Sequence, residues 1–404
     1  MKISWLQIGV LALTGFGFLN FFLNWNLKFL PQILGHRANG HNSSQNASLP
    51  KGQTSISLLS ISSAFKNFIP MKKSFWNQKQ HQMFQELDKL RLQGATVYVP
   101  PQTCNLTGLE TEIPDIHSYS ETHRDFVRYI NCRDHLQKIN HSDKCSDGVF
   151  LLLAVKSTAA NFERRQAIRE TWGKELTLED IRVRTVFLVG SAFNLGQGPD
   201  LQRLLNSEDH LYGDILQWEF KDSLFNLTLK DYLFLKWATA HCPSAQYIFK
   251  GDDDIFLNTP VILEYLQSLD KNQSKQLYVG QTIREATPLR DAKSKYSIPM
   301  SFYDGAYPPY AGGGGFLYSG SLVGSLYAVS HYIPFYPIDD VFTGMCFSAL
   351  GISPLHHQGF QTFDIEAKHR NDPCAHRRLI LVHQRSPLQT MQLWKALHSP
   401  ELQC

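Results

Sequence analysis

The chain has 404 residues, of which 43% are hydrophobic, enough for a large domain with a real buried core. Its formal net charge is only +3, and no block of Lys and Arg residues is interleaved with aromatic residues. This composition lacks the electrostatic footprint of a nucleic-acid-binding protein, so we expect no nucleic-acid partner.

The first apolar segment runs from Trp5 to Leu23 and contains no charged residue. A bilayer is crossed by roughly 20 such residues, whereas a secretory signal peptide has a shorter apolar stretch and a small-residue cleavage site. We interpret residues 5–23 as an uncleaved transmembrane signal anchor, with residues 1–4 as a cytoplasmic tail. A cleaved signal or a buried helix are the alternatives.

The remainder of the chain has the features of a lumenal protein. Asn-x-Ser/Thr acceptor sites for N-glycans occur at Asn42, Asn46, Asn105, Asn140, Asn226 and Asn272. The chain has seven cysteines, which in an oxidising compartment would mostly pair and leave at least one free. We therefore expect disulfide bonds and a glycoprotein facing the lumen.

Composition divides this part into three segments. Residues 24–74 are mostly polar without sustained periodicity, which predicts a flexible stem. Residues 75–147 are mixed, contain a helical stretch from Gln80 to Leu92, and form an N-terminal extension of the catalytic region. Residues 148–404 are predicted to be the catalytic domain.

From Gly148 onward, strand and helix patterns alternate. Strands are predicted at 149–155, 185–190, 214–220 and 247–253, and helices at 161–173, 200–207, 227–242 and 260–269. This alternation predicts an α/β fold in which a mostly parallel sheet carries helices on both faces.

An acidic triplet, Asp252–Asp254, follows the apolar strand YIF. Three adjacent carboxylates repel one another, and a divalent cation such as Mn²⁺ or Mg²⁺ relieves this repulsion while binding substrate phosphates. Ligands of open α/β sheets collect at the carboxyl ends of strands. The sequence therefore indicates a metal–diphosphate site here, and a solvated turn is the structural alternative.

Three further features accompany the triplet. The run Gly312–Gly315 lets the backbone approach a ligand, or forms a bulge or hinge. Asp339 and Asp340 lie between apolar residues, so that one can cap a helix while the other acts as a general base. His383 ends an apolar run and is either a structural residue or a further metal ligand.

Seven blocks in order resemble glycosyltransferase family 31, the β-1,3-glycosyltransferases: RRQAIRETWG, FLVG, FNLTLK, FKGDDDIFLN, YPPYAGGGGFLYSG, YPIDDVFTGMC and the terminal LVH. They are most similar to its β-1,3-N-acetylglucosaminyltransferases. Galactosyltransferases of the family usually have Glu-Asp-Val where this chain has Asp339–Val341. They usually have Cys-Ser-Gly-Thr-Gly where it has Ala311–Gly315.

The resemblance implies a role for each matching residue. Asp252 and Asp254 would form the metal-binding D-x-D with His383, and Asp253 would lie near the donor ribose. Asp340 would be the catalytic base. The remaining donor-binding positions implied by the resemblance are Arg165, Arg169, Asp222, Lys230, Gly312, Gly313, Gly314 and Gly315.

The resemblance also implies the GT-A nucleotide-sugar-binding fold and a single-pass type II protein of the Golgi membrane. We expect an inverting enzyme that moves N-acetylglucosamine from UDP-GlcNAc to the 3-hydroxyl of a terminal β-galactose on a glycoprotein or glycolipid. Its cofactor would be Mn²⁺ or Mg²⁺, and a homodimer is included among its expected partners. The alternatives are a galactose or N-acetylgalactosamine donor, and a glycan-binding or chaperone-like homologue without turnover.

Overall fold

A computed structural model describes residues 56–98, 100, 104, 109–192 and 200–404. The predicted anchor at Trp5–Leu23 and the acceptor sites Asn42, Asn46 and Asn105 lie outside these residues. Within the described ranges, no helix has the length and hydropathy needed to cross a membrane.

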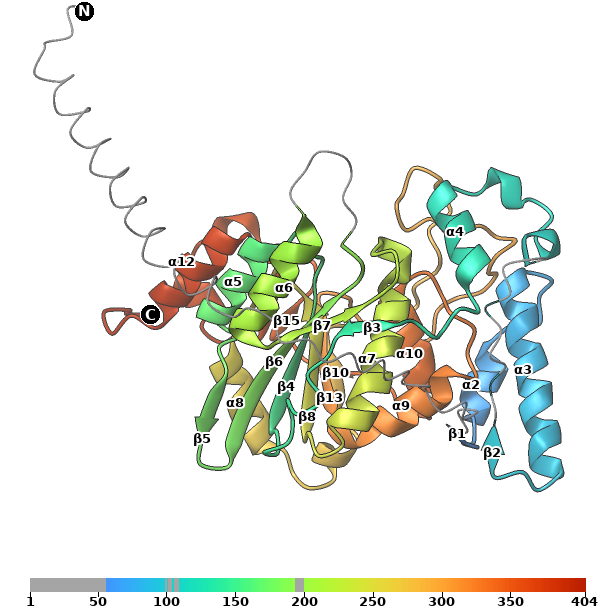
Figure 1. The fold of residues 1–404 in the computed structure, drawn as a ribbon, viewed down its shortest axis with the longest axis horizontal. Coiled ribbons are helices and arrows are strands. Elements are labelled where there is room, and N and C mark those ends of the chain that lie inside the picture. Colours follow the sequence, from blue (N-terminus) through green and yellow to red (C-terminus); the bar gives the residue numbers. More distant parts are fainter. Residues whose placement is uncertain (1–55, 99, 101–103, 105–108, 193–199) are drawn as a thin grey trace, which may run out of the picture. The chain divides into compact units, whose positions relative to one another are not determined.

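A nine-stranded sheet forms the centre of the domain (Figure 1). Its four inner strands run parallel in the order β8-β4-β6-β7, as the alternating pattern predicts. They are β4 (Leu151–Lys156), β6 (Ile181–Val189), β7 (Ile215–Trp218) and β8 (Tyr247–Asp252). Neighbouring strands β13 and β3 run antiparallel to this core, so the sheet is mixed toward its edges. The outer strands are β3 (Gln137–Ile139), β5 (Leu176–Leu178), β10 (Tyr278–Gly280), β13 (Gly315–Ser319) and β14 (Leu355–His356).

Strand β4 shows how the sheet buries both faces. Successive side chains of a strand point to opposite faces, and Leu151 and Leu153 belong to one hydrophobic cluster while Leu152 and Ala154 belong to the other. The first cluster includes side chains of α5 (Phe162–Glu170), α6 (Leu201–Tyr212), α8 (Thr259–Ser268) and α12 (Pro387–Leu397). The second includes side chains of α7 (Leu227–His241), α9 (Val323–Ser330) and α10 (Asp339–Ala349), seen on the opposite side in Figure 1.

The region before the sheet packs on this second cluster. It comprises β1 (Ile56–Ser57), α2 (Ser63–Phe68), α3 (Phe75–Leu92), β2 (Val97–Tyr98) and α4 (Glu121–Tyr129). Phe65 and Trp76 are fully buried, and the backbone N–H of Ser62 donates to Ala349 O at the end of α10 at 2.8 Å.

The predicted stem is therefore too long at its carboxyl end, because residues 56–74 are part of the folded domain. Phe65 in α2 and Ile61 and Ile69 on either side of this helix are buried apolar residues, and their polar neighbours hide the pattern. A helix of six residues is too short for sequence periodicity to reveal.

Besides the pair of β1 with β2, two small sheets and three disulfide bonds complete the described domain. Strands β9 (Ile255–Leu257), β15 (Phe360–Gln361) and β16 (Leu381–His383) form one sheet, and β11 (Thr282–Ile283) pairs with β12 (Tyr310–Ala311). The short helix α11 (Pro373–His376) precedes β16. The disulfides join Cys104–Cys132, Cys145–Cys242 and Cys374–Cys404, and Cys346 is buried with a free thiol, as the odd count predicts.

Candidate active site

The acidic triplet lies at the point where the strand order of the sheet reverses. The chain proceeds from β4 through β6 to β7 on one side and then returns to place β8 on the other side of β4. Ligands of open α/β sheets bind in the crevice at such a switch point. Asp252 ends β8, and Asp253 and Asp254 form the turn into β9.

Asp252, Asp254 and His383 come together as the sequence predicts. One ligand atom from each lies within 4.8 Å of the other two. His383 reaches this position because β16 pairs with β9, which begins directly after the triplet.

The orientation of His383 suits a metal ligand. His383 Nδ1 is 2.8 Å from Thr362 O, to which a protonated Nδ1 donates. His383 Nε2 then faces the cluster, 3.2 Å from Asp254 Oδ1. A metal-binding imidazole usually donates a hydrogen bond from its other ring nitrogen, and this bond fixes the orientation of the ring. Two carboxylates and this imidazole therefore fit a divalent cation.

The charges of the cluster differ from residue to residue. Burial raises the pKa of Asp252, and the neighbouring Lys156 only partly opposes this. Burial acts in the same direction on Asp254, but contacts with His383 and Arg164 outweigh it and lower the pKa of Asp254. Burial alone would lower the pKa of His383, but the contact with Asp254 outweighs it and raises the pKa of His383. A cation would favour the two carboxylates and the neutral imidazole.

Asp253 points away from this cluster toward the start of α5. Its Oδ2 accepts hydrogen bonds from Ser157 Oγ at 2.7 Å and Asn161 Nδ2 at 2.8 Å. Its Oδ1 lies 3.1 Å from Arg164 Nη1. Asp252 and Asp254 thus lie beside His383, whereas Asp253 binds residues at the start of α5.

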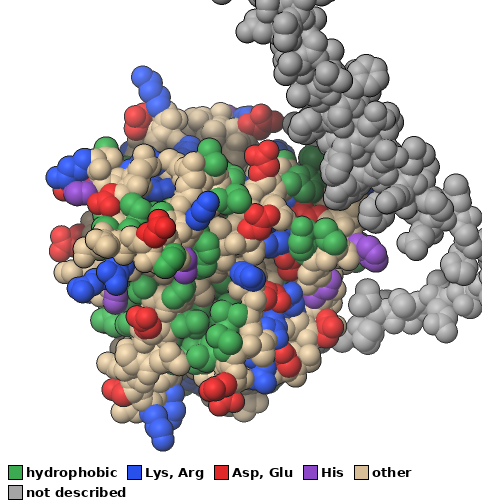
Figure 2. Space-filling view, turned by 90° about the vertical axis from the view of Figure 1, so that its left-hand side faces the viewer, with side chains coloured by type: hydrophobic (Ala, Val, Ile, Leu, Met, Phe, Trp, Pro, Cys, Tyr) green, Lys and Arg blue, Asp and Glu red, His purple; other side chains and the backbone are tan. Residues whose placement is uncertain are grey.

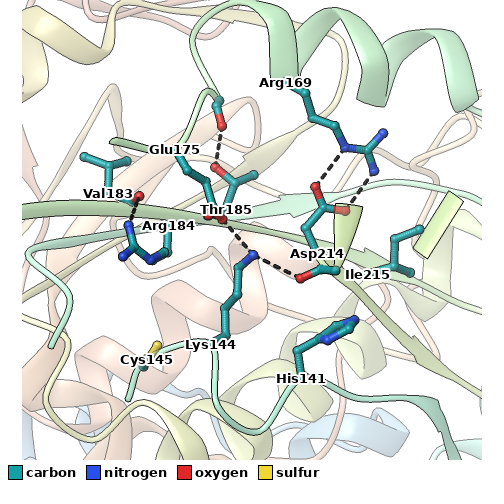
Figure 3. Close-up of polar contacts among 12 residues, drawn as sticks. His141, Lys144, Cys145, Arg169, Glu175, Val183, Arg184, Thr185, Asp214 and Ile215 are labelled. Carbon is teal, nitrogen blue, oxygen red and sulfur yellow. Dashed lines mark hydrogen bonds and ion pairs between the residues drawn. The ribbon is translucent and has the colours of Figure 1, made fainter. Parts of the chain in front are cut away.

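Arg165 and Arg169 bind other parts of the domain rather than the acidic triplet, and their assignment to the donor stays a prediction. All five N–H groups of Arg165 are used: it pairs with Glu208 and donates to the backbone and hydroxyl of residues 157–159. Arg169 forms a bidentate pair with Asp214 (Figure 3). It also donates to Glu208. Both arginines connect α5 to Glu208 of α6, and Arg169 also connects it to Asp214, directly before β7. With no free N–H group, Arg165 has nothing left to donate to a nucleotide.

Arg164 is the arginine of this block that reaches the triplet. Its Nη1 contacts Asp253 and, at 3.5 Å, Asp254 Oδ2, and 36% of its side chain is exposed. Neighbouring residues of a helix point about 100° apart. The sequence shows two adjacent arginines but does not show which one the helix turns toward the crevice.

Asp222 and Lys230 form a buried pair at the same edge of the sheet. Lys230 Nζ lies 2.9 Å from Asp222 Oδ1 and also donates to Ser157 O. Asp222 Oδ2 accepts the N–H of Gly190 at the end of β6, at 2.8 Å. The pair ties together the carboxyl ends of β4, β6 and β7.

A cavity of about 560 Å³ opens beside this pair. Ser191 and Ala192 after β6, Lys221 and Ser223 after β7, and side chains of α4 contribute to its lining. Its volume lies in the range of small-molecule sites. Sequence reasoning did not anticipate a contribution from α4, because α4 is more than ninety residues from Lys221 in the chain.

Asp339 and Asp340 occupy the first turn of α10, whose N-cap is Ile338. The expectation that one Asp caps this helix through its side chain is wrong. Asp339 instead binds Lys156, with Oδ2 2.6 Å from Nζ, and Asp340 Oδ1 accepts the N–H of Val341 at 2.8 Å. Asp339 binds Lys156 instead of capping the helix, because a lysine ammonium group that is buried away from water needs a charged partner.

The two carboxyl groups have opposite pKa shifts. Burial raises the pKa of both groups in itself, but Lys156 and Lys250 outweigh it and hold the pKa of Asp339 below its usual value. Burial and the adjacent Asp339 charge raise the pKa of Asp340 to about 7. A carboxylate of this basicity suits a general base near neutral pH.

The glycine run brings the backbone against both halves of the site. A Cβ on Gly313 would lie 3.0 Å from Asp340 Oδ2, and one on Gly314 would lie 3.4 Å from the ring of His383. A Cβ on Gly312 would overlap Thr362, the residue whose carbonyl orients His383. The run therefore permits close backbone approach, and Gly315 begins strand β13.

Lys156 was missed by sequence reasoning. It ends β4, its side chain is 3% exposed, and its Nζ lies 2.9 Å from Asp252 Oδ1 as well as 2.6 Å from Asp339 Oδ2. Burial alone would lower its pKa, but these two carboxylates raise the pKa of Lys156 well above its usual value. The only sequence signal is a Lys at the end of a wholly apolar strand. This pattern equally well predicts a lysine that is exposed to solvent where the strand ends.

Comparison with known proteins shows the family of the chain. The galactosyltransferase family model matches residues 163–358. N-acetyllactosaminide β-1,3-N-acetylglucosaminyltransferase 2 of Mus musculus is 43% identical over 82% of this chain and 86% of its own length. UDP-GlcNAc:βGal β-1,3-N-acetylglucosaminyltransferase 7 of Rattus norvegicus is 42% identical over 73% and 76%, respectively.

A human relative, N-acetyllactosaminide β-1,3-N-acetylglucosaminyltransferase 3, is 40% identical over 75% of this chain and 83% of its own length. The chain therefore belongs to the β-1,3-glycosyltransferases of glycosyltransferase family 31, and it is an enzyme of that family.

Proposed function

We propose that this enzyme transfers N-acetylglucosamine from UDP-GlcNAc to the 3-hydroxyl of a terminal β-galactose, with inversion at the anomeric carbon. The names of its relatives support the sugar and the linkage. The observation that carries the chemistry is the arrangement of Asp340, whose pKa is raised to about 7, beside a glycine loop that also contacts the carboxylate–histidine cluster.

In this reaction Asp340 accepts the proton of the acceptor hydroxyl as that oxygen attacks the anomeric carbon. UDP leaves from the opposite side of the sugar in the same step. Its diphosphate would lie at the switch point near Asp252 and Asp254, where Arg164 can donate hydrogen bonds to it. Bound there by Asp252, Asp254 and His383, Mn²⁺ or Mg²⁺ would neutralise charge that develops on the leaving diphosphate.

The mixed α/β sheet supports the GT-A fold in particular. The parallel strands β4, β6 and β7 supply a nucleotide half, and the D-x-D follows the next strand, β8. In this assignment the Asp222–Lys230 pair and the adjacent cavity belong to the nucleotide end of the crevice, and the Gly312–Gly315 run belongs to the sugar end.

We further propose a single-pass type II protein of the Golgi membrane, anchored through Trp5–Leu23 and glycosylated in the lumen. The disulfides support an oxidising compartment. Asn140 and Asn272 are exposed in the folded domain, whereas Asn226 is partly buried. Membrane fractionation with and without removal of N-glycans tests this topology, and an unglycosylated cytosolic product would exclude it.

A homodimer is also proposed, with the face formed by α6 and α12 as its contact. Figure 2 looks onto this end of the molecule and shows hydrophobic side chains at the surface between charged ones. Exposed apolar residues on these two helices are Leu204, Leu211, Tyr212, Leu388 and Met391. Light scattering of the purified lumenal domain, with Leu211→Glu and Leu388→Glu as interface variants, tests this proposal.

A panel of UDP-sugars tested with a galactose-terminated acceptor decides the activity. UDP-GlcNAc is expected to be the best donor, and methylation or NMR analysis should place the new bond on the galactose 3-hydroxyl in β configuration. Faster transfer from UDP-galactose or UDP-N-acetylgalactosamine would refute the donor assignment. Absence of both transfer and donor hydrolysis with either metal would refute the assignment as an active transferase.

A further inference from the structure

Lys156 connects the two halves of the site described above. It lies in register with Asp252 in the parallel pairing of β4 and β8, so both side chains leave the sheet on the same face. Leu152 and Ala154, which share this face, pack in the cluster that contains α10. The Lys156 side chain is thereby directed between the end of β8 and the first turn of α10.

The contacts of Lys156 join one metal-cluster residue to the helix of the base. One oxygen of Asp252 is held by Nζ at 2.9 Å, and Asp339, the residue before Asp340, is held at 2.6 Å. Among the side chains that the structure describes, no other donates to both the D-x-D and the first turn of α10.

Stability alone gives little reason for this arrangement. Removing a lysine and two carboxylates from water is costly, and apolar residues of similar volume often stabilise a protein as well or better. A functional need for the position of the Lys156 ammonium group explains this buried charge better than stability does. A side chain that binds a metal-binding carboxylate in this way typically fixes the orientation of that carboxylate.

We propose that Lys156 is a positioning residue that holds Asp252 in its metal-binding orientation and, through Asp339, fixes the start of α10 so that Asp340 faces the glycine loop. This inference rests on the proposed function and adds a mechanical link between its two parts. A disturbance at Lys156 should then affect cation binding and catalytic turnover together.

Lys156→Met tests the link, because methionine has nearly the same length without the ammonium group. Lys250→Met is the matched control. Lys250 lies two residues before Asp252 on β8 and is as deeply buried. It pairs with Asp231 and donates to Thr343 of α10, and it has no contact with the triplet or with Asp339 among the described ion pairs and hydrogen bonds. Both variants lose one buried lysine, so their stabilities should fall alike in denaturant unfolding.

Mn²⁺ binding without donor or acceptor, measured by the EPR signal of the free aquo ion, separates the two variants. Lys156→Met should bind Mn²⁺ about tenfold to a hundredfold more weakly, and Lys250→Met should keep wild-type affinity. Lys156→Arg keeps the charge and should restore part of the affinity. In transfer assays at saturating Mn²⁺ and donor, kcat of Lys156→Met should remain about a hundredfold low, because a base displaced by 1 Å loses that much.

Unchanged or tighter Mn²⁺ binding in folded Lys156→Met would overturn the proposal, since Lys156 would then be inert or a competitor of the cation. Equal losses in both lysine variants would also overturn it in favour of a structural role. If Lys156→Met does not fold, the Mn²⁺ affinity and the kcat of Lys156→Arg and Asp339→Asn decide between the proposal and a structural role. Loss of Mn²⁺ affinity in an enzyme that prefers another UDP-sugar would refute the donor assignment while leaving the link intact.

Discussion

Asp339 and Asp340 follow one another at the start of α10, yet Asp339 accepts a hydrogen bond from Lys156 Nζ whereas Asp340 accepts one from the N–H of Val341. Lys156 and Lys250 keep the pKa of Asp339 low against the effect of burial, and burial together with the Asp339 charge raises the pKa of Asp340 to about 7. Adjacent carboxylates in different environments can take different roles. The first of them supports the site and the second is placed to react.

Asp340→Asn should reduce transfer by at least roughly a hundredfold, because the amide cannot accept the proton of the acceptor hydroxyl. Affinity for UDP-GlcNAc, measured by calorimetry, should change little, since the base acts on the acceptor. Asp339→Asn should instead lower the free energy of unfolding by about 3 kcal/mol, because it leaves Lys156 with one carboxylate partner fewer. If a folded Asp339→Asn enzyme lost more turnover than Asp340→Asn, the assignment of the base to Asp340 would be wrong.

The pH dependence of kcat/KM for the acceptor should show a limb near pH 7. Asp340 acts as a base only when deprotonated, so the rate should fall as pH decreases through its pKa of about 7 and level off above it. Saturating cation should move the limb to lower pH, because positive charge favours the carboxylate. The residual activity of Asp340→Asn should lack this limb, and a limb that persists in that variant would assign it to another group.

Removal of divalent cations should abolish transfer, and Mn²⁺ or Mg²⁺ should restore it. Without a cation the carboxylates of Asp252 and Asp254 would repel the UDP diphosphate. Asp254→Ala and His383→Ala should each weaken Mn²⁺ binding by at least about tenfold in the same EPR measurement, since each removes one ligand. His398→Ala, at the end of α12, serves as the control histidine. Full activity in excess chelator would refute the metal assignment.

Arg164→Ala and Arg165→Ala should fail in different ways. Arg164 is partly exposed and faces the triplet, so its loss should raise the KM for UDP-GlcNAc about tenfold, equivalent to roughly 1.4 kcal/mol, and leave the unfolding midpoint nearly unchanged. Arg165 is fully buried, and its loss leaves Glu208 without one of its two arginines. The expected cost is about 3 kcal/mol of folding stability. A stable Arg165→Ala enzyme with weakened donor affinity would support the assignment of Arg165 to the donor.

The sequence predicts the central strands well because their residues are continuously apolar and are buried on both faces of the sheet. It also predicts the meeting of Asp252, Asp254 and His383, which the pairing of β9 with β16 produces. It does not distinguish Arg164 from Arg165, since their directions depend on where α5 begins. Nor does it reveal Lys156, whose role depends on a register between strands nearly a hundred residues apart.

The packing of α2 and α3 sets the amino-terminal boundary of the folded domain. Trp76 Nε1 donates to Pro334 O and Gln80 Nε2 to Tyr332 O, and both acceptors lie in the segment that leads into α10. Helix α2 contacts the other end of α10. A soluble form for crystallisation or synthesis should therefore begin before Ile56. A form that begins at residue 75, at the end of the predicted stem, keeps α3 but lacks α2. It would expose the apolar residues that pack against Phe65 of α2 and should be recovered mainly as aggregate.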